Sequence, residues 1–171
     1  LIPRSYVALH HLSYNVLPWL NVGLFESMVF GQNNRSNLTF LQPVILLNSL
    51  LGRKGGENNG NMGMDAKANI AKHVQVYGQL LFDNLDGKSS SGAKGSQAWT
   101  NKYAYQLGAK YVDVLGVKNL DLQVEYNQVR PFTYSGSDTM LSLTHYRQPL
   151  AHPMGGNVRE VVGILRYQPL N

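Results

Sequence analysis

The chain has 171 residues, no cysteine and a net charge of +5, with 43% hydrophobic and only 15% charged residues. Soluble domains carry ~25% charged residues, and the basic residues here are spread along the chain, which excludes a nucleic-acid patch. Without cysteine, neither a disulfide framework nor a thiolate metal site can form.

The length suits one domain, residues 1–171, and no run approaches the ~18 apolar residues of a membrane-spanning helix. The sequence opens on Leu1-Ile-Pro-Arg, without an initiator methionine or a signal peptide, and closes just after a strand-like segment. We therefore expect this domain to be part of a longer protein.

Seven segments alternate apolar and polar residues with the period of two that is typical of β-strands. In the clearest one, 120–127, Leu120, Leu122, Val124 and Tyr126 share one side, and every intervening residue is polar. The predicted strands are 6–16, 19–30, 61–70, 74–83, 101–112, 120–130 and 158–167.

Three of these segments have imperfect alternation. His10 and His11 interrupt the first, and Val162 and Ile164 fall on the polar side of the last. Glu26 falls on the apolar side of the second, which predicts either a β-bulge there or a covering of protein.

The connections alternate between short and long. The short ones are 17–18, 71–73 and 115–119, and the long ones are 31–60, 86–98 and 131–157. In an up-and-down meander all short turns therefore lie at one end and all long loops at the other, as in outer-membrane barrels. We expect a short helix or packed segment within 38–51.

These features predict an all-β fold, part of an antiparallel up-and-down transmembrane β-barrel with about seven strands and apolar side chains facing lipid. An odd strand count implies further strands, because bacterial single-chain barrels use even numbers. The alternative is a soluble barrel, such as a lipocalin-like meander, with the apolar side chains inside. Aromatic residues expected at the membrane interfaces are Tyr14, Trp19, Phe30, Phe82, Tyr111 and Tyr167.

On the barrel hypothesis, the opposite side of each strand faces the lumen. Lys102 or Lys110 can then pair with Asp83, Asp121 or Glu125 on nearby strands. The predicted lumen-facing polar residues are Asp65, Lys67, Gln75, Gln79, Lys102, Gln106, Lys110, Asp121, Gln123, Glu125 and Asn127.

The third long connection carries polar and aromatic residues of a kind that contact sugars: His145, Tyr146, Arg147, Gln148 and His152. Two interpretations stay open for them. They form a hydrogen-bonded loop core folding over or into the lumen, or they bind a glycan or an anion.

Enzyme chemistry is not indicated. His10 and His11 point to opposite sides of a strand and cannot chelate one metal together. Asp65, Asp121 and Glu125 are typical partners of lysine and arginine on a lumen face rather than paired catalytic carboxylates. No phosphate-binding loop or nucleophile elbow is present, so we expect no enzyme activity, metal or cofactor.

Five stretches, taken together, suggest a family: Leu9–Tyr14; Trp19–Glu26; Val76–Asp83; Gln106–Asp113 with Lys118–Asn127; and Thr144–Pro153 with Glu160 and Gly163–Pro169. The sequence resembles the gliding-motility RemB-like outer-membrane proteins, which are related to the capsule-assembly Wzi-like barrels. The Gln-Pro-Leu-Ala-His-Pro segment from Gln148 is the most specific part.

The resemblance implies a β-barrel in the cell outer membrane, surrounded by lipid, that acts in gliding motility or in the assembly and attachment of surface polysaccharide. No binding residue of the family transfers one by one. A pore for small solutes or ions is the first alternative function, and a soluble ligand carrier is the second.

Overall fold

The computed structural model of the chain describes residues 4–31, 44–45, 58–83, 102–136, 141–145 and 148–169. These residues form one antiparallel sheet of seven strands and a small two-stranded ladder. No α-helix occurs among them. The short helix or packed segment predicted within 38–51 and the predicted loop 86–98 lie outside the described residues, apart from Val44 and Ile45.

The seven long strands have 9 to 13 residues each, which matches the length predicted from the alternation. They are β1 (Ser5–Leu17), β2 (Leu20–Gly31), β3 (Asn58–Ile70), β4 (Val74–Asp83), β5 (Tyr103–Tyr111), β6 (Leu120–Val129) and β9 (Val158–Tyr167). The third strand begins three residues before its predicted start at Asn61.

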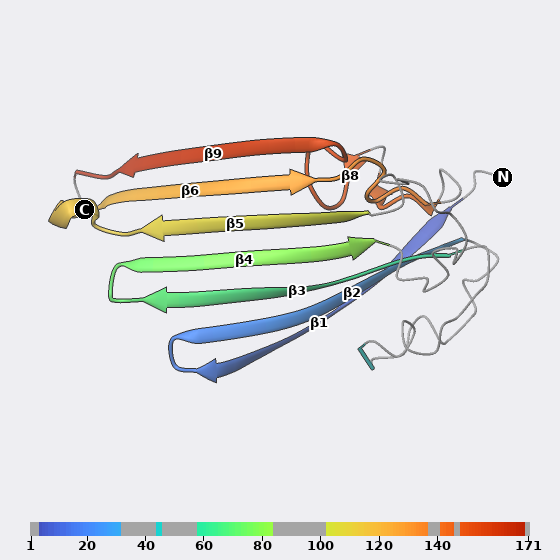
Figure 1. The fold of residues 1–171 in the computed structure, drawn as a ribbon, viewed down its shortest axis with the longest axis horizontal. Coiled ribbons are helices and arrows are strands. Elements are labelled where there is room, and N and C mark those ends of the chain that lie inside the picture. Colours follow the sequence, from blue (N-terminus) through green and yellow to red (C-terminus); the bar gives the residue numbers. More distant parts are fainter. Residues whose placement is uncertain are drawn as a thin grey trace, which may run out of the picture.

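The strands follow one another in the order β1-β2-β3-β4-β5-β6-β9, each antiparallel to its neighbour. This is the predicted up-and-down meander. Figure 1 shows the short turns β1–β2, β3–β4 and β5–β6 together at one end of the sheet, which we call the turn end. The opposite end, where the long connections leave the strands, is the loop end.

The β5–β6 connection is a more structured turn than its sequence predicted. It contains one turn of 3₁₀-helix, η3 (Val114–Gly116), with Leu115 and Gly116 at positive φ. The Asn119 N–H donates a hydrogen bond to Asp113 Oδ1 at 2.8 Å and closes the turn.

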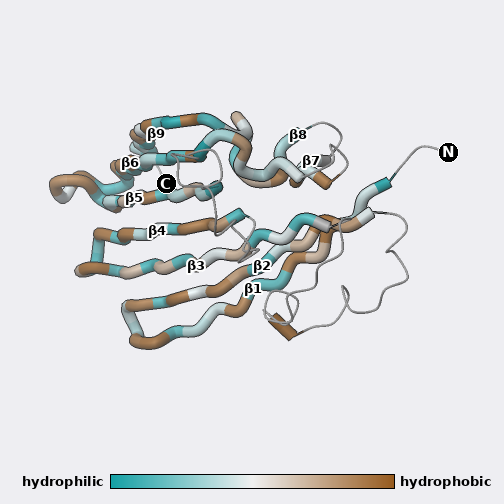
Figure 2. Tube along the Cα trace, turned by 45° about the vertical axis from the view of Figure 1, so that its right-hand side comes forward, coloured by the Kyte–Doolittle hydropathy of each residue, from teal (hydrophilic) through white to brown (hydrophobic). Residues whose placement is uncertain are grey.

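The register separates the side chains of the sheet into two faces. One cross-strand row reads Val22, Ala66, Gly78, Leu107, Tyr126 and Val161 from β2 to β9. The adjacent row, one residue along each strand and therefore on the opposite face, reads Gly23, Asp65, Gln79, Gln106, Asn127 and Glu160. We call these the apolar face and the polar face, and Figure 2 shows the hydropathy changing from residue to residue along the strands.

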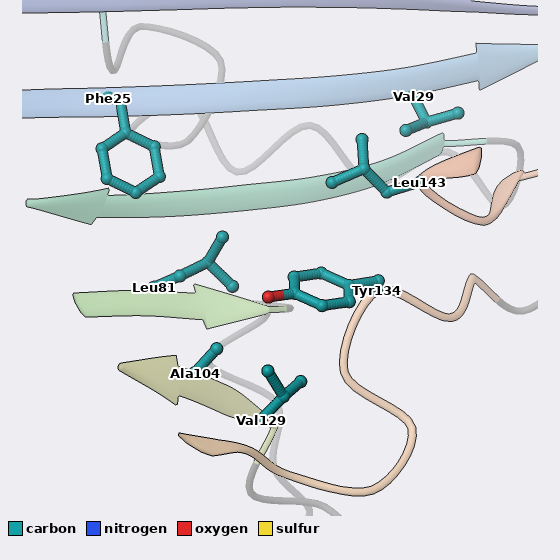
Figure 3. Close-up of a cluster of buried hydrophobic side chains, with 7 residues drawn as sticks. All are labelled: Phe25, Val29, Leu81, Ala104, Val129, Tyr134 and Leu143. Carbon is teal, nitrogen blue, oxygen red and sulfur yellow. The ribbon is translucent and has the colours of Figure 1, made fainter. Parts of the chain in front are cut away.

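The buried core of the described residues lies on the polar face, at the loop end. It joins side chains of four strands to the connection between β6 and β9 (Figure 3): Phe25, Val29, Leu81, Ala104, Val129, Tyr134 and Leu143. That connection also holds the small ladder of β7 (Thr144–His145) and β8 (Gln148–Pro149). The described part of the third long connection is therefore packed against the sheet.

The structure refines three expectations. The sheet is open in the described residues, since β1 and β9 are its edges and do not pair with each other. The register of β2 is continuous through Glu26, so no bulge explains this residue. Phe30, expected at a membrane interface, is instead buried and stacks on Tyr6 at 5.7 Å between ring centroids.

Candidate functional site

The polar face gathers nearly all the charged side chains of the sheet. The strand residues predicted to face a lumen all lie on it: Asp65, Lys67, Gln75, Gln79, Gln106, Lys110, Asp121, Gln123, Glu125 and Asn127. Lys102 precedes β5 and reaches Asp83 at 3.9 Å, which is one of the ion pairs predicted from the sequence. Of the charged residues and histidines in the seven long strands, only His10, Glu26 and Arg159 lie on the apolar face.

A tyrosine spans three strands at the centre of the polar face. Tyr77 on β4 lies over Gly108 on β5, where any Cβ would meet the phenol ring. The Tyr77 hydroxyl thereby reaches β6, donating to Glu125 Oε2 at 2.7 Å and accepting from Gln123 Nε2 at 2.9 Å. Glycine at position 108 is therefore required for a hydrogen bond between side chains that are two strands apart.

The same arrangement recurs at Gly23 on β2. His11 Nε2 on β1 lies 2.8 Å from Asp65 Oδ2 on β3, and a Cβ on Gly23 would collide with both side chains. An aromatic ring also covers Gly63, where a Cβ would meet the Phe25 ring. Glycines that admit side chains from a neighbouring strand are thus a repeated feature of this face.

A hydrogen-bond chain continues from Glu125 to the third long connection. Asn127 Nδ2 donates to Glu125 Oε1 at 3.0 Å and to Glu160 Oε2 on β9 at 3.3 Å. His152 Nε2 lies 3.1 Å from the same Glu160 oxygen. The Met154 N–H points to His152 Nδ1 at 3.3 Å, which favours the tautomer that donates from Nε2 to Glu160.

Polar contacts fix the connection at the loop end as well. The Tyr134 N–H donates to Asp83 Oδ2 at 2.8 Å, and Lys102 Nζ donates to the Ser135 carbonyl at 2.9 Å. Asn59 Nδ2 donates to the Leu141 carbonyl at 3.2 Å. Burial of the phenol, and secondly the nearby Asp83 charge, raises the pKa of Tyr134 to about 12.

Two hollows open on the polar face, on either side of the segment that contains Leu150 and Ala151. The larger has a volume of about 790 Å³, and its lining combines His11, Asp65 and Lys67 with apolar residues such as Phe25 and Leu143. The smaller, about 480 Å³, is lined by polar residues that include Glu125, Asn127, His152 and Glu160. Both volumes fall within the range of ligand-sized sites.

Among the described residues, much of the apolar face is exposed. Met64, Leu107 and Val161 lie on three different strands and are 50%, 58% and 71% exposed. Its central exception is the pair His10 Nδ1 and Glu26 Oε1, 3.3 Å apart, with Glu26 buried. Two of the residues that disturb the sequence alternation therefore contact each other.

The residues suggested as glycan contacts are only partly placed. His152 points toward Glu160, and Gln148 is exposed on β8. His145 belongs to β7, whereas Tyr146 and Arg147 lie outside the described residues. Tyr77, Glu160 and Gly108 were not predicted as site residues, although the first two fall on the polar side of the alternation.

No group of three or more histidine, cysteine or acidic side chains able to hold a metal ion occurs in the described part of the chain. In the same residues, no helix combines the length and the hydropathy needed to cross a bilayer. Comparison with protein-family models, curated proteins and solved structures finds no match to this chain.

Proposed function

We propose that the chain forms part of the wall of a β-barrel in a bacterial outer membrane, with its apolar face against lipid and its polar face toward an aqueous interior. The observation that carries the proposal is the contrast between the two faces. The apolar face is exposed, whereas the polar face is hydrogen-bonded and packed against a long connection. A soluble carrier requires the reverse, with the apolar face inside.

Dimensions support the same proposal. A strand of about ten residues rises ~34 Å, and at a tilt of ~40° it spans ~26 Å. This height is close to the ~25 Å apolar band of outer-membrane barrels. Arg159 is a charged residue of the apolar face and the second residue of β9, at the loop end. A charge in that part of a membrane costs ~0–1 kcal/mol.

Aromatic side chains flank the bare apolar surface. Tyr14, Trp19 and Tyr167 lie toward the turn end and are exposed. Phe82, Tyr103 and Tyr105 lie toward the loop end, where Tyr103 and Tyr105 stack at 6.5 Å between ring centroids. Aromatic belts at both interfaces are typical of transmembrane barrels. The turn end would then be periplasmic and the loop end extracellular.

We further propose that the protein acts at the cell surface, in gliding motility or in the attachment of surface polysaccharide, as its family resemblance implies. The packing of the third long connection against the polar face favours this role over that of an open pore. Leu143 and Tyr134 are buried there against four strands, and such packing narrows the interior at its outer end. The pore remains the competing function because the polar face is charged.

Lipid contact is tested by quenching of tryptophan fluorescence in vesicles of brominated phosphatidylcholine. The two native tryptophans are first replaced, Trp19→Phe and Trp99→Phe. A single tryptophan is then introduced by Leu107→Trp on the apolar face or by Gln106→Trp on the polar face. Strong quenching at 107 and weak quenching at 106 is expected. Equal quenching, or a chain that stays in solution without lipid, contradicts the membrane proposal.

The surface role is tested separately on the reconstituted protein. Retention of extracellular polysaccharide on a glycan array, together with no steady conductance in planar bilayers, is the expected result. A steady open channel without glycan retention would instead identify a pore.

A further inference from the structure

A third hollow, of about 490 Å³, opens at the loop end, where β6 finishes and β9 begins (Figure 1). Two arginines line it, Arg130 just after β6 and Arg159 on β9, together with Gln128 and Asn157. The described residues of its lining include neither Asp nor Glu. We call it the basic hollow. Because two positive charges share this lining, the hollow suits an anion.

Strand register places both arginines on the apolar face. Gln128 lies opposite Arg159 in the ladder of β6 and β9, in one row with Tyr105 of β5. Arg130 comes two residues after Gln128 and therefore shares its face, and the Asn157 N–H donates to the Arg130 carbonyl at 3.3 Å. Arg130 and Arg159 are thus diagonal neighbours, whose backbones are ~7–8 Å apart in antiparallel pairs. Two long side chains at this spacing can reach one phosphate group.

Tyrosines position the donors of the basic hollow. Arg130 Cζ lies 5.4 Å from the centre of the Tyr103 ring, and a guanidinium over a ring keeps its N–H donors at its edge. The Tyr105 and Tyr126 hydroxyls both donate to Gln128 Oε1, at 3.0 and 3.1 Å. The Gln128 amide nitrogen, a donor, is therefore on the other side of that side chain.

The position of the basic hollow favours a lipid over a soluble anion. Next to it on the same face, toward the middle of the sheet, Val161 is 71% exposed and Leu107 is 58% exposed. On the proposed function these side chains contact acyl chains, and the hollow lies at the level of the outer-leaflet head groups. Arginine binds phosphate in a fork of two N–H donors. A free phosphate would gain nothing from the apolar surface, whereas a lipid would use both.

We propose that the basic hollow binds the phosphate of a lipid head group in the outer leaflet, which rests on the proposed function. Arg130 and Arg159 donate to the phosphate oxygens, and the Gln128 amide donates to a neighbouring oxygen of the head group. The acyl chains lie along the apolar face of β9, over Val161. This ligand also accounts for a charged residue, Arg159, on the side of the sheet that faces lipid.

Quenching by brominated lipids tests the proposal on the full chain reconstituted in vesicles. The native tryptophans are replaced, Trp19→Phe and Trp99→Phe. One tryptophan is introduced beside the hollow, Val161→Trp, or in the same cross-strand row on β3, Ala66→Trp. Brominated phosphatidic acid is then compared with brominated phosphatidylcholine. Each arginine near an anionic surface contributes about fivefold, so phosphatidic acid should be preferred about tenfold or more at 161 and hardly at 66. Equal preference at both positions would overturn the proposal.

Substitution of the arginines tests whether they cause that preference. Arg130→Gln with Arg159→Gln, in the Val161→Trp chain, should remove it, while quenching by brominated phosphatidylcholine stays unchanged and shows that the variant inserts. The double lysine variant should keep part of the preference, because it keeps the charges and loses the forked geometry. Arg166→Gln is the control, since Arg166 lies opposite Asp121 on the polar face of β9, and should keep all of it. A preference that survives the double glutamine variant, or is lost in the control, contradicts the proposal.

Two further comparisons separate the possible failures. Inorganic phosphate added to the vesicles should leave the preference at position 161 intact, and its loss would identify a soluble phosphate as the ligand and overturn the lipid assignment. A tryptophan at 161 that neither lipid quenches would contradict membrane insertion, and this proposal with it. Quenching by both lipids with equal affinity would contradict this proposal alone.

Discussion

Two adjacent histidines on β1 show how different the two faces of this sheet are. His10 lies on the apolar face and meets a buried carboxylate, with Glu26 only 5% exposed in its side chain. His11 lies on the polar face and meets Asp65, whose side chain is 28% exposed. One step along a strand therefore moves a histidine–carboxylate pair from a mostly apolar surface to a surface of polar side chains.

The same comparison holds for the whole sheet. On the polar face, glycines let side chains reach across strands, and hydrogen bonds connect β4, β6, β9 and the third long connection. On the apolar face, side chains such as Leu107 stand exposed. The polar face is thus specified by particular partners, whereas the apolar face is specified mainly by its hydropathy. Substitutions should affect the two faces in different ways.

The largest effect is expected from a charge placed in the middle of the apolar face. Leu107→Arg should destabilise the membrane-inserted protein by about 2–4 kcal/mol, the cost of arginine near the bilayer midplane of a barrel. Its neighbour on the polar face, Gln106→Arg, should cost far less. Urea unfolding from phospholipid vesicles measures both. Equal costs would remove the distinction between the faces.

Truncation of the core under the third long connection should come next. Leu143→Ala should lower the free energy of unfolding by about 2 kcal/mol. This is the lower end of the range for truncation of a buried leucine, because a connection can relax around the cavity. Leu143 is 6% exposed, whereas the control Leu150 is 49% exposed, so Leu150→Ala should cost less. Amide hydrogen exchange of residues 141–150 reports how often this part of the connection opens away from the sheet. Similar exchange in both variants would argue against anchoring by Leu143.

The two histidines offer a matched pair of intermediate size. His10→Ala removes the histidine from a buried carboxylate and should cost about 1–3 kcal/mol. His11→Ala breaks a partly exposed pair and should cost at most about 1 kcal/mol, less in high salt. Unfolding in vesicles at two salt concentrations checks this order. A larger loss for His11→Ala would reverse our view of which pair is buried.

A methyl group at Gly108 tests the tyrosine that crosses β5. Gly108→Ala should cost roughly 1 kcal/mol, because its Cβ displaces the Tyr77 ring and weakens the bonds to Glu125 and Gln123. Gly163→Ala on the apolar face of β9 is the control, since a Cβ there meets no atom within 4 Å. Thermal unfolding should show a lower midpoint temperature for Gly108→Ala and an unchanged one for Gly163→Ala.

Ionisation of Tyr134 should have no effect at neutral pH. Its pKa is raised to about 12 from the ordinary 10.0, because burial disfavours the phenolate. A raised folded-state pKa contributes stability that is complete below pH 10 and is lost as the pH rises through 12. Absorbance titration of the ten tyrosines should include a late step from Tyr134, and Tyr134→Phe should remove that step. An unchanged late step would assign it to another tyrosine.

Much of the sheet could be predicted from local pattern. The alternation along Leu120–Val129 and Val74–Asp83 gave those strands nearly to the residue, and the short turns gave the meander. The alternation also assigned residues such as Asp65 and Gln106 to one face, because side chains in a strand alternate whatever surrounds them.

The partners of those residues could not be predicted in the same way. Nothing local to Tyr77 indicates that it lies over Gly108 and bonds to Glu125, 48 positions away. The pairing of His10 with Glu26 required the β1–β2 register, and the burial of Phe30 required its contact with Tyr6. Each depends on which strands adjoin and in what register, and alternation alone does not contain that information.

By itself, the sequence determined seven alternating strands, their up-and-down order and the separation of apolar from polar side chains, because these follow from a period of two and from the lengths of the connections. Only the tertiary structure decided which face is covered. In the described residues it packs the connection after β6 onto the polar face and leaves large side chains of the apolar face, such as Leu107, exposed. The physical reason is that a two-faced strand is equally compatible with either face inward, and only contacts between segments distant in sequence choose between them.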